Sequence, residues 1–350
     1  MKYRVFIKDP STSEIWELPF LSIRFTEELN KDKDADFAFD LEIIDNFLTE
    51  VGITIDSVTS SSIRHIYIED EEETVVYYGV LSDQNESKDS AGSYKLNLAS
   101  VGIFSLLQKA IVGKPLKTYT ATDAGAMAWD MIDEYQNSDT PYSDFGITEG
   151  SITATKDRDR TLRFRRIKDV IEKMSSNNLE DGFDFDIDNT LAFNVYDQKG
   201  SQRDEIVLED GDNILTWTLH KPLVSALTNK VYGIGAGQND DDLLWVEREA
   251  IDSYKSSFGL LEEILSEKEI ITEDTLNDKC DKVLSDEQAP KYGLVVTLTD
   301  ESPMLTDYNV GDSLRVVIPK KSIDAFYRIR QRTVNIESNG SVVVTLTMEP

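Results

Sequence analysis

Apolar and polar residues alternate with a period of two over long stretches at both ends of this chain of 350 residues. The pattern covers residues 2–9, 15–29, 293–300, 312–320 and 341–349. Successive side chains of a strand point to opposite faces of a sheet, so this period indicates half-buried antiparallel strands. The chain is therefore expected to be rich in β-structure at both ends, with short strands of the kind that build sandwiches and barrels.

Further strand and turn signals refine this expectation. The run 37–44 predicts another strand with four apolar side chains on one side, Phe37, Phe39, Leu41 and Ile43. Residues 51–55 continue the strand pattern, and residues 74–100 predict two strands around a polar loop, with a bulge or sharp bend at Gly79. The strongest hairpin signal is Asn339-Gly340, which lies between two alternating runs.

The middle of the chain has a mixed pattern. Thr122 or Asp123 can cap a helix over residues 124–137. The residues of this helix expected to be buried are Ala126, Trp129, Met131 and Ile132. Helical spacing of apolar residues predicts a second helix over 167–174, and a β-hairpin is expected over 182–200.

These patterns divide the chain into three parts. Residues 1–115 and 206–350 are β-rich, and residues 116–205 form an α+β unit. A helical insertion is expected near 250–290 within the last part. The strands of 206–237 leave two assignments open, since they can complete the first β-region or belong to the second.

The charge of the chain excludes a general nucleic-acid binder. Asp and Glu number 66 against 36 Lys and Arg, which gives a formal net charge of −30. A protein that grips nucleic acid needs cations to neutralise phosphates, and this chain repels them over most of its surface. Cys280 is the single cysteine, so no disulfide can form within one chain, which fits a reducing compartment. We expect neither a signal peptide, because residues 1–14 alternate like a strand, nor a membrane-spanning helix, because no apolar run reaches about 18 residues.

One basic cluster stands out in this acidic sequence. It comprises Arg158, Arg160, Arg163, Arg165, Arg166 and Lys168. Two interpretations stay open. The cluster is a docking patch for an acidic partner or for another copy of this chain, or it is a helix N-terminal region balanced by Asp157, Asp159 and Asp169. A role in phosphate binding ranks third.

Two sequence motifs that suggest metal or cofactor binding lack residues that such sites require. The run Asp184, Asp186, Asp188 and Asn189 suggests a calcium loop, but its sixth and twelfth positions hold Asn189 and Val195 where an EF-hand needs Gly and Glu. We expect the aspartates on a solvated strand face. Gly233, Gly235 and Gly237 lack the spacing of a dinucleotide fingerprint, and three aspartates follow them, so a strand end or close backbone approach is expected.

No catalytic constellation is evident from the sequence. The two histidines, His65 and His220, are far apart and lie in strand-like segments, so ordinary packing is expected. Asp278 and Asp281 beside Cys280 should raise its thiol pKa and leave it inert. We therefore expect no catalytic, metal-binding or cofactor-binding residue and no cofactor.

The order of these features resembles one family, the baseplate hub or minor tail proteins of long-tailed bacteriophages. The hairpin over 80–100 leads into a short apolar helix at 101–112, before Gly113-Lys114-Pro115-Leu116. A helix around Trp129 then precedes a helix and hairpin over 163–197. A strand pair ending in a Gly-rich strand and a closing β-hairpin complete the pattern, which spans essentially the whole chain.

The resemblance implies a fold and an assembly. Each chain would carry two tail-tube-like β-barrel domains, over 1–115 and 206–350, with the α+β domain of 116–205 between them. Three chains would form a pseudo-sixfold ring that adapts the sixfold tail tube to the threefold tip and surrounds the DNA exit channel. The implied partners are the tail tube or distal tail protein, the tape measure protein and a tip fibre or spike.

The resemblance also implies a location, the virion tail tip, with assembly in the host cytoplasm. The expected role is structural and not enzymatic. Two alternatives stay open, a tail-associated cell-wall hydrolase with an Asp/Glu site and a carbohydrate-binding receptor module.

Overall fold

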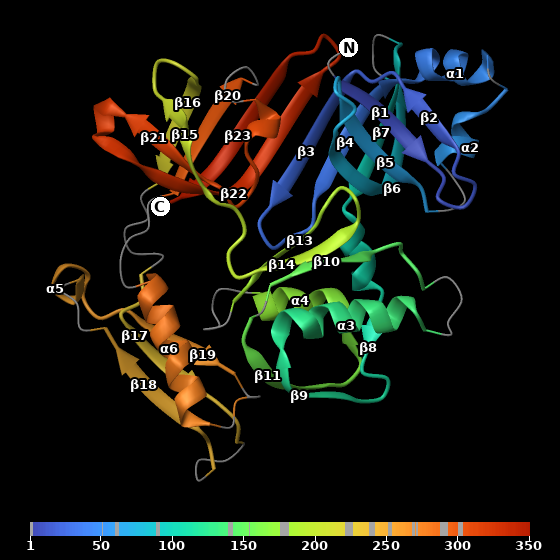
Figure 1. The fold of residues 1–350 in the computed structure, drawn as a ribbon. Helices are drawn as coiled ribbons and strands as arrows, with labels where there is room; N and C mark the ends of the chain where they lie inside the picture. Colours follow the sequence, from blue (N-terminus) through green and yellow to red (C-terminus); the bar gives the residue numbers. More distant parts are fainter. Residues whose placement is uncertain are drawn as a thin grey trace.

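The computed structural model describes most of the chain (Figure 1). The described residues are 3–50, 52–59, 63–88, 92–138, 143–153, 155–175, 182–220, 227–237, 242–250, 254–267, 270, 272–287, 293–299 and 304–350. Within them, no helix is both long and apolar enough to cross a lipid bilayer.

A large sheet of 13 strands dominates the described part of the chain. Its N-terminal half contains β1 (Tyr3–Lys8), β2 (Ile15–Leu18), β3 (Ser22–Glu28), β4 (Asp34–Asp40), β5 (His65–Asp70), β6 (Val75–Lys88) and β7 (Tyr94–Val101). Its C-terminal half contains β15 (Gln202–Glu209), β16 (Ile214–His220), β20 (Gly293–Thr299), β21 (Ser313–Ile318), β22 (Ile323–Glu337) and β23 (Val342–Glu349). The strand order is β16-β20-β23-β22-β3-β4-β7-β6-β5-β1-β2, and β21 bridges β22 and β15.

The two halves of the sheet meet where β3 pairs antiparallel with β22. In this register Phe25 lies opposite Val334, and Ile23 lies opposite Ile336. The expected β-rich α+β class is confirmed. Two separate barrels are not confirmed, because both halves share one sheet and one hydrophobic core. Alternation reveals which face of a strand is buried but not which strand lies beside it.

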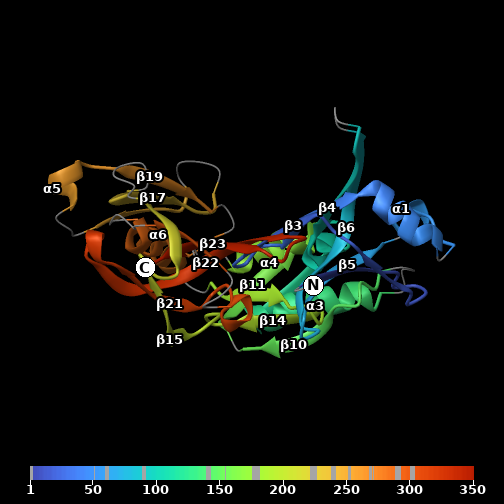
Figure 2. The ribbon, with the colours of Figure 1, turned by 90° about the horizontal axis from the view of Figure 1, so that it is seen from above.

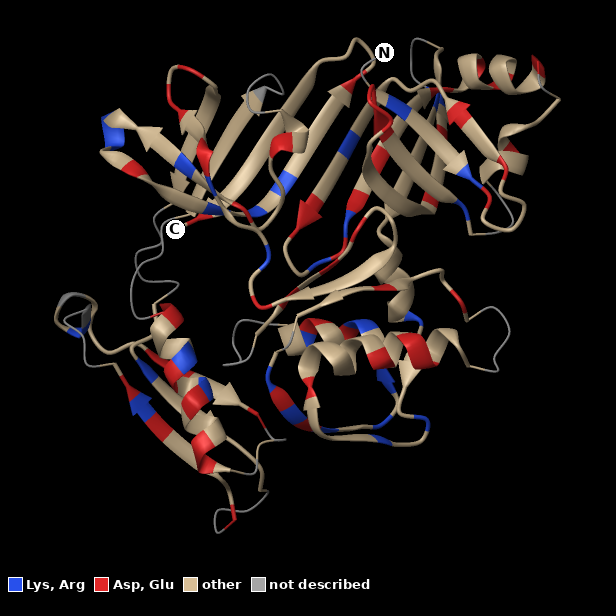
Figure 3. Cartoon of the chain, in the orientation of Figure 1, with Lys and Arg blue, Asp and Glu red and all other residues tan. Residues whose placement is uncertain are grey.

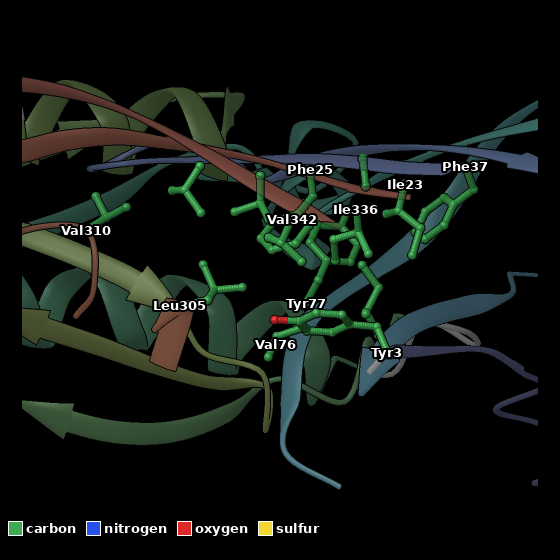
Figure 4. Close-up of a cluster of buried hydrophobic side chains, with 14 of the residues drawn as sticks. Tyr3, Ile23, Phe25, Phe37, Val76, Tyr77, Leu305, Val310, Ile336 and Val342 are labelled. Atoms are coloured by element: carbon green, nitrogen blue, oxygen red, sulfur yellow. The ribbon is translucent and has the colours of Figure 1, made fainter. Parts of the chain in front are cut away.

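The shared core draws on both ends of the chain. Figure 4 shows Tyr77 of β6 among side chains from β3 and from the C-terminal hairpin, including Phe25, Ile336 and Val342. The Tyr77 hydroxyl lies 3.0 Å from Ser100 Oγ, so its buried oxygen has a polar partner. The core therefore joins strands separated by most of the sequence.

In the N-terminal half, the strand expected over 37–44 is confirmed only as far as Asp40, and the strand expected over 51–55 is wrong. Strand β4 ends at Asp40, and helix α1 (Leu41–Glu50) begins at the next residue. The Asp40 carboxylate accepts hydrogen bonds from the backbone N–H groups of Glu42 and Ile43, at 3.0 and 3.2 Å, and so caps the helix. The next expected strand gives way to helix α2 (Ile55–Thr59). A cap and the buried i, i+4 pair of Ile44 and Leu48 override the alternating pattern.

Gly79 has a different role from the expected bulge. The register of β6 against β7 shifts between Leu81 and Asp83, two residues later. A Cβ atom on Gly79 would lie 2.6 Å from both Ser100 Oγ and the Tyr77 hydroxyl. Glycine is needed here because the hydroxyl groups of Tyr77 and Ser100, on β6 and β7, lie directly against its backbone.

The middle unit has its own core beneath the large sheet (Figure 1). Its elements are η1 (Ile103–Gln108), β8 (Ile111–Val112), β9 (Lys117–Asp123), α3 (Ala124–Gln136), β10 (Thr148–Ile152), β11 (Asp157–Leu162), β12 (Arg165–Arg166), α4 (Ile167–Ser175), β13 (Asp184–Ile187) and β14 (Ala192–Tyr196). The two expected helices and the β13–β14 hairpin are confirmed, and Asp123 caps α3. The apolar helix expected over 101–112 is shorter, since η1 is a 3-10 helix of six residues. Ala126 is exposed and not buried as expected.

A third unit packs one helix on a small sheet. Its elements are β17 (Lys230–Ile234), β18 (Trp245–Glu249), α5 (Tyr254–Phe258), β19 (Glu262–Ser266) and α6 (Glu273–Glu287). The sheet order is β18-β17-β19, and Figure 2 shows α6 on one side of β17 and β19. A Cβ atom on Gly233 would lie 2.6 Å from Cys280 Sγ of α6. The expected close backbone approach at these glycines is therefore confirmed.

Gly200 and Gly211 provide a test of backbone packing in this fold. Both have positive φ, +87° and +98°, so an alanine at either position should cost about 1–2 kcal/mol of unfolding free energy. Only Gly200 has a close neighbour, because its Cβ would lie 2.2 Å from the Gly311 carbonyl carbon. We expect Gly200→Ala to lose a further ~1–3 kcal/mol in urea unfolding. Equal losses for Gly200→Ala and Gly211→Ala would contradict this close approach.

Candidate functional site

A charged cleft of about 370 Å³ lies where the large sheet meets the middle unit. Its walls come from the loop after β3, the β13–β14 hairpin, residues 199–200 and residues 309–312. Figure 3 shows acidic and basic segments facing one another along this junction. We treat this cleft as the candidate site because ionisable groups gather in it from distant parts of the sequence.

A buried ion pair forms the wall on the large-sheet side. Arg332 of β22 binds Glu27 of β3 through Nη2 at 2.5 Å and through Nε at 3.0 Å, both to Oε2. Its Nη1 donates to the carbonyls of Leu305 and Tyr308, at 2.9 and 2.7 Å. Burial raises the pKa of Glu27, but Arg332 and Lys33 outweigh it and lower that pKa to about 2. The carboxylate therefore stays charged throughout the physiological range.

Residues 30–33 carry the contacts across to the middle unit. Asn30 Nδ2 donates to Asp184 Oδ1 at 2.8 Å, and Asn30 Oδ1 accepts the Phe185 backbone N–H at 2.9 Å. Lys33 Nζ lies 3.2 Å from Glu27 Oε1 and donates to Asn189 Oδ1 at 2.9 Å. One amide and one ammonium thus tie the β3–β4 loop to the hairpin of the middle unit.

The C-terminal half of the sheet reaches the same hairpin. Arg328 Nη2 lies 2.5 Å from Asp184 Oδ2 and 2.8 Å from the Lys199 carbonyl oxygen. Lys199 donates its backbone N–H to Asp184 and its ammonium to Asp186, at 2.8 and 2.7 Å. The expected solvated strand face is wrong for Asp184, which is only 3% exposed, whereas Asp186 and Asp188 are half-buried. The cation that binds Asp184, Arg328, comes from β22, and alternation cannot detect a partner so distant in the sequence.

Asp32 is the ionisable group with the most unusual environment in the cleft. Its Oδ2 lies 3.1 Å from Lys168 Nζ of α4, and its Oδ1 accepts the Lys33 backbone N–H at 3.1 Å. Burial dominates over the attraction of Lys168 and raises the pKa of Asp32 to about 6. Glu27 and Asp32 therefore line one cleft with pKa values pushed apart, a pattern also seen in acid–base sites.

The contacts of these groups favour a structural joint over a reaction centre. Glu27 is held by Arg332 and Lys33, and Asp32 is held by Lys168. Each carboxylate described above has a cation or an amide bonded to it, so its charge already serves the junction. Among the described residues, no group of three or more His, Cys, Asp or Glu side chains is arranged to bind a metal ion.

The five arginines predicted as a docking patch do not line the cleft, whereas Lys168 of the same basic cluster binds Asp32 there. Arg158 and Arg160 are half-buried on β11, which pairs with β9, so this part is a strand and not the start of a helix. The exposed members are Arg163, Arg165 and Arg166. Arg165 and Arg166 pair with β8 immediately before α4. The docking role of the cluster remains a prediction.

The histidines and the cysteine occupy ordinary positions. His65 is buried with Nδ1 2.6 Å from the Tyr78 hydroxyl, and burial, with Lys8 nearby, lowers its pKa to about 4. His220 is exposed at the end of β16. Burial, followed by Asp281, raises the pKa of Cys280 to about 11. The expected direction for Cys280 is confirmed, but burial contributes more than the neighbouring carboxylate.

Comparison with known proteins shows which solved structures share this fold. No protein-family model matches the sequence, and no curated protein matches it either. Among solved structures, the 43 kDa tail protein of prophage MuSo2 from Shewanella oneidensis matches with a TM-score of 0.68 at 11% identity, over 99% of this chain and 97% of that chain. The chain has the fold of phage tail proteins. The resemblance found in the sequence is confirmed at this level.

Two further structures share this fold. A tail protein from Neisseria meningitidis MC58 matches with a TM-score of 0.65 at 12% identity, over 100% of this chain and 97% of that chain. The E. coli c3393 protein, a type VI secretion component described as similar to the phage T4 tail proteins gp27 and gp5, matches with a TM-score of 0.55 at 12% identity. That match covers 95% of this chain and 74% of that one.

The Arg332–Glu27 pair yields a stability prediction. Replacing Arg332 by methionine leaves the Glu27 carboxylate buried without its main partner, which should cost about 3–5 kcal/mol of unfolding free energy. The matched control is Arg315→Met, which removes an exposed pair with Asp324 and should cause only a small fraction of that loss. Similar losses for the two variants in urea unfolding would show that the buried pair is not essential to the sheet.

Asp32 yields a prediction of pH dependence. Because its pKa rises from an unfolded value near 3.8 to about 6, the folded state holds a proton between these values that the unfolded state has lost. This group therefore lowers stability as pH rises from about 4 to 6, by about 1.4 kcal/mol per pH unit. Asp32→Asn should remove that contribution. The unfolding free energy of the variant, relative to that of wild type, should therefore increase as pH rises from about 4 to 6. Parallel pH profiles for both proteins would refute the assignment.

Proposed function

We propose that this chain is a structural hub protein of a phage tail tip. The observation that carries the proposal is the likeness of fold over nearly the whole chain to phage tail proteins. In this proposal three copies close into a ring at the tip, which adapts the sixfold tail tube to a threefold end. In this ring, residues 1–115 and 206–350 surround the DNA channel, and residues 116–205 lie beneath them.

The charge of the chain supports a channel role. A ring of three copies, each with a net charge of −30, presents a like-charged wall to DNA that passes through it. Such a wall avoids the cation–phosphate contacts that would hold the nucleic acid. The proposed partners are the tail tube or distal tail protein, the tape measure protein and a tip fibre or spike, and the proposed location is the virion after assembly in the host cytoplasm.

A second candidate, a cell-wall hydrolase, is favoured by one observation. Glu27 and Asp32 line the same cleft with pKa values of about 2 and 6. This candidate requires peptidoglycan clearing in a zymogram that Asp32→Asn abolishes. The ion pairs that hold both carboxylates place it second.

The hub proposal has a direct test. Light scattering during size-exclusion chromatography should give the mass of three chains of 39.6 kDa each. Antibody labelling in negative-stain images should mark the tail tip of the virion. A chain that stays monomeric at tens of micromolar and is absent from virions would reject the proposal.

A further inference from the structure

The small sheet leaves one of its faces open. Helix α6 covers the face to which Val231, Gly233 and Val246 point. The opposite face carries Trp245 and Ile264, which are 58% and 64% exposed. In the sheet register these two side chains flank the β17 residues Ile234 and Tyr232, so they form one apolar patch.

Acidic side chains surround this patch. Glu247 and Glu262, which are on the same face, share the single ammonium of Lys230, at 2.7 and 3.9 Å. Over residues 227–287 the sequence holds 16 Asp and Glu residues against six Lys and Arg residues. The open face is therefore apolar at its centre and lies in a strongly acidic unit.

The middle unit presents a surface of the opposite kind. Phe164 is 61% exposed, and its neighbours Arg163, Arg165 and Arg166 are exposed as well. Residues 156–168 hold seven Lys and Arg residues against two Asp residues. We name residues 163–166 the Phe164 knob.

The backbone holds the knob in place. Phe164 has φ of +46°, a strained conformation for a bulky residue, and its N–H donates to the Gly113 carbonyl at 2.9 Å. The β12–β8 pairing fixes Arg165 opposite Val112. An exposed aromatic ring beside arginines on a rigid backbone has the composition of an interface hot spot.

We propose that the Phe164 knob of one copy docks on the open face of the β18–β17–β19 sheet of a neighbouring copy. This inference rests on the proposed ring of identical chains. The ring of Phe164 would cover Trp245 and Ile264, and the arginines would meet Glu247 and Glu262. Arginine also stacks favourably on tryptophan, which adds to the charge complementarity.

A second copy is the occupant because the two surfaces lie apart within one chain. Strand β8, which pairs with the knob, and the small sheet lie on opposite sides of α3 and α4 in Figure 1. The contact is therefore head-to-tail, with different surfaces on the two partners. Contacts of this kind generate closed rings when the rotation between copies closes.

Complementation between two variants tests the proposal. Arg163→Glu/Phe164→Asp removes the knob, and Trp245→Lys/Ile264→Lys turns the open face cationic. Each variant alone should lose assembly, with an apparent dissociation constant raised at least ~100-fold. An equimolar mixture should form a heterodimer, since one chain retains the face and the other retains the knob. Mass is measured by light scattering.

The controls separate this proposal from the hub proposal. Leu215→Asp changes an equally exposed apolar residue, 57% exposed on β16, and should assemble like wild type. Circular dichroism should show the same unfolding temperature for both surface variants as for wild type. Trimers from either variant, or no heterodimer in the mixture, would overturn the docking contact while leaving the hub intact. A monomeric wild type would instead count against the ring itself.

Discussion

The antiparallel pairing of β3 with β22 holds the two halves of the large sheet together. It joins strands about 300 residues apart in one ladder, and it places Arg332 against Glu27 inside the sheet. Closing so long a segment costs chain entropy, which the shared core and the ladder must offset. The buried ion pair adds selectivity, because a shifted register would leave both charges without partners in a dry environment. The β3–β22 strand pair therefore sets how the two halves of the sheet lie relative to each other and to the middle unit beneath them.

The charged cleft lies between the β3–β22 strand pair and the middle unit, and its side chains connect the two. Asn30 and Lys33 come from the N-terminal half, Arg328 comes from the C-terminal half, and all three bind the β13–β14 hairpin. Buried charges with this many bonds are costly to separate, so the hairpin is held in one orientation. The same bonding explains why a cleft rich in ionisable groups need not be a reaction centre. Its groups are already engaged in holding two units together.

Two exposed surfaces of the chain complement one another. The acidic small unit exposes an apolar sheet face, and the middle unit exposes an aromatic knob among arginines. In the proposed ring of chains with net charge −30, such a local basic surface would provide attraction between copies that otherwise repel. A ring assembled in this way would keep most of its acidic surface facing solvent and any nucleic acid that passes.

Local patterns in the sequence were sufficient to predict the elements with clear signals. The caps and spacing around Asp123 predicted α3, the apolar spacing from Ile167 predicted α4, and alternation predicted most strands. The sequence also contained a signal for the buried Glu27–Arg332 pair that the alternation analysis did not use. Glu27 lies between Phe25 and Leu29, and Arg332 lies two residues before Val334, so both charges are in the apolar phase of their strands.

Tertiary structure alone decided which strands pair, that the two β-rich ends form one sheet, and that Asp184 is buried beneath Arg328. The physical reason is that period and caps depend on neighbours within a few residues. Strand partners and charge partners depend instead on which distant segments the chain brings together.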